Sequence, residues 1–155
     1  MRSTFLRSWM VKPVLITVLT LICAACAHEV LHTNIKYKEF EMLKANVESG
    51  EDLEARDLYG FTPLLVAAYY NRGPMVKYLC EKGANINAIN KDGMSSLLYA
   101  VLYGYDDTFD ILMEYGADVN LVDKKGHSAI WYAKHYNRNR MGQKLEEAGA
   151  KPPLE

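Results

Sequence analysis

A repeat with a period of 33 residues restricts the fold of this sequence more than any other feature. Glycines recur at this spacing in two series, Gly60, Gly93 and Gly126, and Gly50, Gly83, Gly116 and Gly149. The segment GANIN at 83–87 returns as GADVN at 116–120. A fixed period of this length indicates a stack of small units, each of which buries its apolar face against its neighbours.

The unit at 57–89 predicts a turn followed by two short helices. Asp57 and Gly60 suit a β-turn, because Asp can accept hydrogen bonds from the following backbone and Gly adopts a positive φ without strain. Thr62 and Pro63 predict the first helix start, an N-cap hydroxyl followed by a residue that has no N–H to leave unpaired. Ser95 and Ser128 occupy the position of Thr62 in the next two units and are expected to cap in the same way.

The second helix of this unit is equally well delimited. Asn71 tolerates the left-handed conformation that ends the first helix, Pro74 opens the second, and Gly83 ends it. The residues of the second helix that we expect to point inward are Met75, Val76, Leu79 and Cys80; their counterparts in the next unit are Phe109, Leu112 and Met113.

The period, the TPL start at 62–64 and the GADVN end resemble the ankyrin repeat. The resemblance is close over residues 57–150 and partial over 28–56. It implies an all-α ankyrin-repeat solenoid of about four helix-turn-helix units with β-turn tips, at about 28–56, 57–89, 90–122 and 123–152. The end units are expected to be polar, since Asn34 and Lys38 occupy the first helix of the opening unit and Lys134 and Glu146 replace core residues in the last. In the opening unit the second helix is predicted at roughly Phe40–Glu48.

Residues 1–27 do not share the repeat and predict a secretory signal peptide. Arg2, Arg7 and Lys12 precede an uncharged stretch, Pro13–Ala27. As a helix this stretch would span ~22 Å, short of the ~30 Å hydrocarbon core. Ala25-Cys26-Ala27 offers a small-x-small cleavage site, so we expect cleavage before His28 and a domain at 28–155.

Two alternatives for the leader remain open: a retained membrane anchor, and lipoprotein processing at Cys26, which follows two small residues but has Cys23 where an aliphatic residue is usual. The expected location is therefore periplasmic or secreted, with a lipoprotein anchored through Cys26 as the alternative. Without the leader, 15 basic and 19 acidic residues remain, a net charge of −4. This charge gives no support for nucleic-acid binding.

By the resemblance, partners bind on a concave face formed by the turn tips and the exposed side of the first helices. The residues expected on this face are Tyr59, Phe61, Tyr69, Tyr70, Met94, Leu102, Tyr103, His127, His135 and Tyr136. Tyr37, Tyr70, Tyr103 and Tyr136 are each 33 residues apart. These tyrosines either fill space between adjacent helices or form an aromatic binding surface, where rings give large contact area at low rotamer cost. We favour the binding surface.

No motif for catalysis, nucleotide binding or zinc binding occurs in the sequence. His28 and His32 are spaced i, i+4, but no third metal ligand lies near them in sequence. Cys80 is expected to be buried and therefore unreactive. We predict no enzyme activity, no metal and no cofactor.

The function expected from these features is protein recognition by an exported module that is monomeric when free. The resemblance suggests an immunity or inhibitor protein, or an accessory of a periplasmic stress enzyme. The alternatives are a lipid-anchored structural protein of the envelope and a protein that binds a small molecule or haem.

Overall fold

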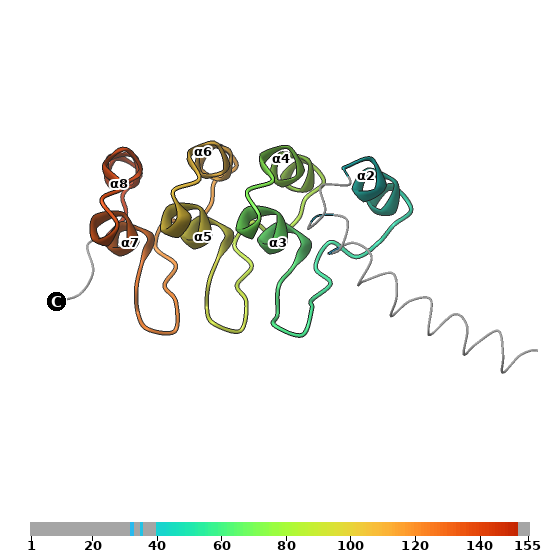
Figure 1. The fold of residues 1–155 in the computed structure, drawn as a ribbon, viewed down its shortest axis with the longest axis horizontal. Coiled ribbons are helices and arrows are strands. Elements are labelled where there is room, and N and C mark those ends of the chain that lie inside the picture. The colour runs from blue at the N-terminus through green and yellow to red at the C-terminus, as the bar shows by residue number, and fades with distance from the viewer. Residues whose placement is uncertain (1–31, 33–34, 36–39, 152–155) are drawn as a thin grey trace, which may run out of the picture.

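The computed structural model describes His32, Ile35 and residues 40–151. This part of the chain contains seven helices and no strand: α2 (Phe40–Glu48), α3 (Pro63–Tyr69), α4 (Gly73–Glu81), α5 (Ser96–Tyr103), α6 (Asp106–Glu114), α7 (Ala129–His135) and α8 (Asn139–Glu147). The first helices α3, α5 and α7 form one row, and the second helices α2, α4, α6 and α8 form another (Figure 1). The predicted all-α stack of repeated units is confirmed, and α2 has the predicted bounds.

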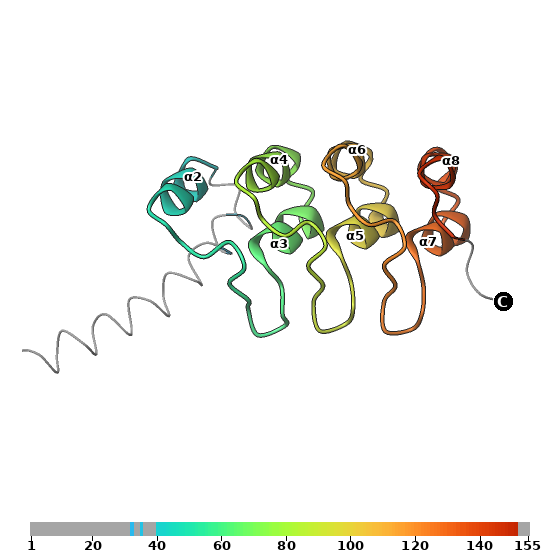
Figure 2. The same cartoon turned by 180° about the vertical axis from the view of Figure 1, so that it is seen from behind.

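Long loops join each second helix to the next first helix, and all of them project from the same side of the stack (Figures 1 and 2). The Oδ1 atom of Asp57 accepts hydrogen bonds from the N–H groups of Tyr59 and Phe61, at 2.8 and 2.9 Å. Gly60 has the expected positive φ of 81°. Asn90 and Asp123 make the same pair of bonds in their loops. A carboxylate or amide oxygen at this position therefore shapes each loop tip.

Backbone hydrogen bonds connect neighbouring loops. The Lys91 N–H donates to the Tyr59 carbonyl at 3.1 Å, and one unit later the Lys124 N–H donates to the Asp92 carbonyl at 3.0 Å. Because the same bond recurs at the same place in successive units, the loop tips form a continuous edge and not a set of independent arms.

The helix starts follow the sequence prediction in two units of three. The side chains of Thr62 and Ser95 accept hydrogen bonds from the N–H groups three residues on, at 3.4 and 3.3 Å. Ser128 occupies the N-cap of α7, but its side chain makes no capping bond. The prediction that Ser128 caps with its hydroxyl is therefore wrong, although its backbone has the extended conformation of the other two caps.

Left-handed residues end the first helices, as predicted for Asn71 and Gly104. Asn71 has a φ of 54° and Gly104 a φ of 74°, and Asn137 repeats the value of Asn71. A Cβ atom at Gly104 would lie 2.6 Å from Cζ of Arg138. Gly104 thus allows the guanidinium of the next unit to pack against the backbone.

The core lies between the two rows and continues through the stack. It is formed by equivalent residues of successive units, of which Leu64, Leu97 and Ile130 on the first helices and Leu79, Leu112 and Leu145 on the second are almost completely buried. Full burial of such a side chain contributes roughly 1.5–3 kcal/mol to stability. Cys80 and Met113 are half-buried, so the prediction of fully buried positions there is wrong.

Several predictions concern residues outside the described part of the chain: the leader 1–27 with Cys26, the terminus at His28, Tyr37, and the polar residues Asn34 and Lys38. Among the residues that the structure describes, no helix has both the length and the apolar character needed to cross a lipid bilayer.

Candidate functional site

Six aromatic rings from the second and third units form one contact network, which we call the aromatic cluster: Phe61, Tyr69, Tyr70, Tyr99, Tyr103 and Tyr105. Tyr69 is its centre, with ring centroids 5.2 Å from Tyr99 and 5.7 Å from Tyr103, both at near-perpendicular angles. Edge-to-face pairs of this kind each stabilise by about 0.5–1.5 kcal/mol beyond their buried area. The rings on α3 and α5 are therefore fixed against one another.

Tyr99 fixes the cluster to the loop behind it. Its side chain is 6% exposed, and its hydroxyl accepts a hydrogen bond from Nδ2 of Asn90 at 2.9 Å. Burial raises the pKa of Tyr99 to about 12, and the bond from Asn90 opposes part of this rise. Tyr103 stacks on Tyr99 at 6.2 Å and remains 41% exposed. One ring is thus buried and holds the next ring at the surface.

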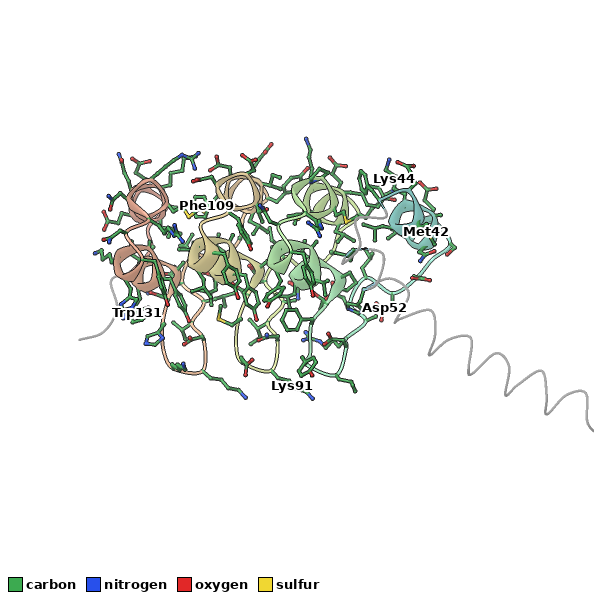
Figure 3. The ribbon with its side chains drawn as sticks, viewed as in Figure 1. Met42, Lys44, Asp52, Lys91, Phe109 and Trp131 are labelled. Carbon is green, nitrogen blue, oxygen red and sulfur yellow. The ribbon has the colours of Figure 1, made fainter. Side chains whose placement is uncertain are left out.

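A second group of rings lies in the last unit and consists of His127, Trp131, Tyr132, His135 and Tyr136, which we call the histidine–tryptophan stack. The indole of Trp131 lies between two imidazoles, 3.6 Å from the His127 centroid and 4.6 Å from the His135 centroid, and nearly parallel to both. Trp131 projects near the outer end of the array (Figure 3). The spacing i, i+4, i+8 along α7 places the three rings above one another.

Tyr132 holds this stack as Tyr99 holds the cluster, but with the reverse hydrogen-bond polarity. Its hydroxyl donates to Oδ2 of the buried Asp123 at 2.6 Å. Burial and this bond to a carboxylate both raise the pKa of Tyr132. Burial alone would raise the pKa of Asp123, but hydrogen bonds from Tyr132 and from the N–H groups of His127 and Lys125 outweigh it and lower the pKa. Asp123 is therefore a buried carboxylate with three donors.

Met94 lies between the two groups of rings. It is 7% exposed, and the Tyr132 hydroxyl lies 3.8 Å from its sulfur. The prediction that Met94 is on the exposed surface is wrong, because the rings of the next unit cover it. The contact instead joins the third unit to the histidine–tryptophan stack.

The other predicted surface residues differ in their exposure. Tyr59 is 71% exposed at a loop tip, Tyr136 is 44% exposed, and His135 is also exposed. The half-buried members are Phe61, Tyr69, Tyr70, Leu102 and His127. In the described chain no ring contact joins Tyr70, Tyr103 and Tyr136 to one another directly, so the residues spaced by 33 do not form a continuous stack.

Sequence reasoning missed four of these rings: Tyr99, Tyr105, Trp131 and Tyr132. A signal was present for two of them, since Tyr99 and Tyr132 are themselves 33 residues apart and precede Tyr103 and Tyr136 by one helical turn. Trp131 has an equally simple signal, because it is four residues from each histidine. These missed residues form the buried base of the surface whose exposed edge the sequence predicted.

The described residues show little that would support covalent or metal chemistry. Burial, and then the neighbouring Glu81, raise the pKa of Cys80 to about 11, which keeps its thiol protonated. No group of three potential His, Cys, Asp or Glu ligands occurs in the described ranges. A hollow of about 290 Å³ lies near the starts of α6 and α8, and Arg140 in its lining pairs with Asp106 at 2.7 Å.

The comparisons with known proteins agree with the repeat found in the sequence. The family described as ankyrin repeats (3 copies) matches residues 17–123. This match begins inside the segment predicted as a leader and stops at the first residue of the last unit, whose loop, helices and left-handed residues nevertheless repeat those of the matched units. No curated protein matches the chain.

Proposed function

Because the chain belongs to the ankyrin repeat family, a family of protein–protein interaction modules that are generally not enzymes, we propose that it recognises a protein partner through the ring-bearing side of α3, α5 and α7. In this proposal the contact surface is the exposed edge of the aromatic cluster and of the histidine–tryptophan stack, together with the loop tips.

One observation carries the proposal: exposed rings are held in place by buried ones. Tyr103 stacks on the buried Tyr99, and Tyr136 stacks on the buried Tyr132 at 6.3 Å. A ring that is already fixed loses little conformational entropy when a partner covers it, so more of its contact energy appears as affinity. Tyrosine and tryptophan are also the residues most often found as energetic hot spots of protein interfaces.

Photo-crosslinking tests where the partner binds. Tyr103 would be replaced by the photoreactive amino acid p-benzoylphenylalanine in the full-length chain, and the product irradiated in an extract of the source cells. A second variant would carry the same group at Tyr115, a tyrosine at the end of α6 whose hydroxyl bonds to Glu81 at 3.3 Å. We expect a discrete crosslinked species from position 103 and none from position 115. Crosslinking at 115 alone would contradict the proposed surface.

We further propose that residues 1–27 direct export and that the module acts outside the cytoplasm, as a stoichiometric inhibitor or accessory of an exported enzyme. The basic flank and the apolar stretch of the leader support export. Mass spectrometry of the mature protein tests it: a free amino terminus at His28 agrees with cleavage by signal peptidase, a diacylglyceryl group on Cys26 with a lipoprotein. An intact Met1 terminus on a cytosolic protein would contradict both.

A further inference from the structure

The positive charge of the chain is concentrated in its last unit. Residues 123–151 carry seven lysines and arginines against three acidic residues, whereas residues 28–122 carry eight against fifteen. The domain as a whole is therefore acidic, and its last unit is basic. A local positive region on an acidic molecule affects which partners approach it and in what orientation.

The side chains divide by face within this unit. On the second-helix side, Arg140 binds Asp106 and Asp110, and Lys144 binds Asp110 at 2.8 Å. These cations neutralise the acidic helix α6. Lys134 is likewise paired, at 3.3 Å from Glu146. The positive charge on the second-helix side is thus largely used within the molecule.

The lysines of the loop tips have no such partners. Lys124 and Lys125 are exposed, and no ion pair joins either of them to a carboxylate in the described part of the chain. Lys91, at the tip of the preceding loop (Figure 3), donates to the Leu58 carbonyl at 2.8 Å, which leaves its charge uncompensated. Asp123 lies close in sequence, but it is buried and already accepts three hydrogen bonds.

The opposite end of the same edge is apolar. Where the third and fourth units have Lys91 and Lys124, the second unit has Leu58, which is largely exposed, and next to it Tyr59. The edge of loop tips therefore changes along the stack from two apolar side chains to three lysines. Next to the lysines, His127 and His135 are fixed in orientation by stacking on Trp131.

From this distribution we infer that the partner presents an acidic polypeptide segment, with aromatic or aliphatic anchors, to the loop tips and the adjacent rings. Its carboxylates lie at the third and fourth units, where Lys91, Lys124 and Lys125 offer unpaired charge. Its apolar anchors lie toward the second unit, against Tyr59 and the aromatic cluster. This inference rests on the proposed function, and it names the chemistry of the partner.

The test uses defined probes. Full-length chain would be immobilised, and the binding of a glutamate–tyrosine random copolymer, a lysine–tyrosine random copolymer and polyglutamate measured by biolayer interferometry. We expect the glutamate–tyrosine copolymer to bind best, polyglutamate more weakly because it has no anchors, and the lysine–tyrosine copolymer not at all. Raising NaCl from about 50 to about 300 mM should weaken binding, since exposed charges are screened beyond the Debye length.

Charge reversal then places the site. The double variant K124E/K125E should lower affinity for the glutamate–tyrosine copolymer by about tenfold or more, because like charges would now face each other. The matched control is K77E/K82E, which makes the same change in charge at exposed lysines of α4 and its C-cap. We expect the control to alter affinity by less than about threefold, an effect of net charge alone.

The outcomes separate this inference from the proposed function. Preference for the lysine–tyrosine copolymer, or equal losses in the two double variants, overturns the acidic partner and leaves the ring surface in place if Tyr103→Ala still abolishes binding. Copolymer binding that is unaffected by Tyr103→Ala with Tyr136→Ala overturns the surface itself. Stronger binding to vesicles of anionic lipid than to the glutamate–tyrosine copolymer also overturns the inference.

Discussion

The third and fourth units have the same backbone but differ in what covers their first helices. In the third unit α5 packs between α3 and α7, and Leu98 is fully buried. The fourth unit has Trp131 at the equivalent position on α7, and no first helix follows it in the described chain. The indole is half-buried, and two imidazoles of its own unit cover its faces.

This difference shows how an end unit replaces its missing neighbour. Val101, buried on α5, becomes Lys134 on α7, which is exposed and paired with Glu146. Trp131 is instead covered by rings from the same helix and its loop. A solenoid must make its terminal face soluble, and here one position became charged while the other kept an aromatic ring that its neighbours partly cover.

The largest expected contrast is between truncations at these two equivalent positions. Leu98→Ala should lower the free energy of unfolding by about 2–5 kcal/mol, because it opens a cavity between packed helices. Trp131→Ala should cost about 1 kcal/mol, the loss of ring contacts at a half-exposed site. Urea denaturation followed by circular dichroism measures both. Equal losses would mean that the last unit is packed like an interior one.

A smaller contrast is expected between the two buried tyrosine hydroxyls. Tyr132→Phe removes a hydrogen bond to a carboxylate and should cost about 1.5–3 kcal/mol at pH 7, whereas Tyr99→Phe removes a neutral bond worth about 1 kcal/mol. Urea denaturation of each variant at pH 7 gives the two values. The reverse order would contradict the assignment of Asp123 as a buried ionised group.

The pH dependence sharpens this test. The pKa of Asp123 is below its ordinary value of 3.8, so the ionised carboxylate stabilises the folded chain above that pH, and this contribution is lost as pH falls through the lowered pKa. The penalty of Tyr132→Phe should therefore shrink as pH approaches 3, while that of Tyr99→Phe should not change. A constant Tyr132→Phe penalty would show that Asp123 does not ionise in the folded protein.

The smallest effect is expected at the ion pairs between the third and fourth units. Burial alone would raise the pKa of Asp110, but its bonds with Lys144 and Arg140 outweigh burial and lower the pKa. Because these groups are largely exposed, Asp110→Asn should cost less than about 1 kcal/mol, and less still at high salt. Asp107→Asn, on the same helix, is the control. A loss of several kcal/mol, unchanged by salt, would point to a structural role beyond the ion pairs.

Most of the fold could be predicted from the sequence because its signals are local. The turn at Asp57, the cap at Thr62 and the left-handed residue Asn71 each depend on the chemistry of one residue and its immediate neighbours. The 33-residue period then placed the same features in the later units. Ser128 shows the limit of this transfer, since it has the position of a capping residue without the hydrogen bond.

The surface was predicted less well because exposure depends on contacts between units. Met94 has the position of Phe61 and His127, yet the hydroxyl of Tyr132, 38 residues away, lies against its sulfur. Nothing in the local sequence indicates that contact. The same reason hid Tyr99 and Tyr132, whose burial follows from bonds to Asn90 and Asp123, nine residues before each of them.

The central claim is that rings on α3, α5 and α7 form the partner-binding surface, and its most direct test is the affinity of the crosslinked partner for ring variants. Isothermal titration calorimetry would compare wild type, the double variant Tyr103→Ala with Tyr136→Ala, and the control Tyr115→Ala on the second-helix side. Each truncation at a hot spot costs about 2 kcal/mol or more, so the double variant should bind at least about a hundredfold more weakly and the control like wild type. Wild-type affinity in the folded double variant would contradict the account.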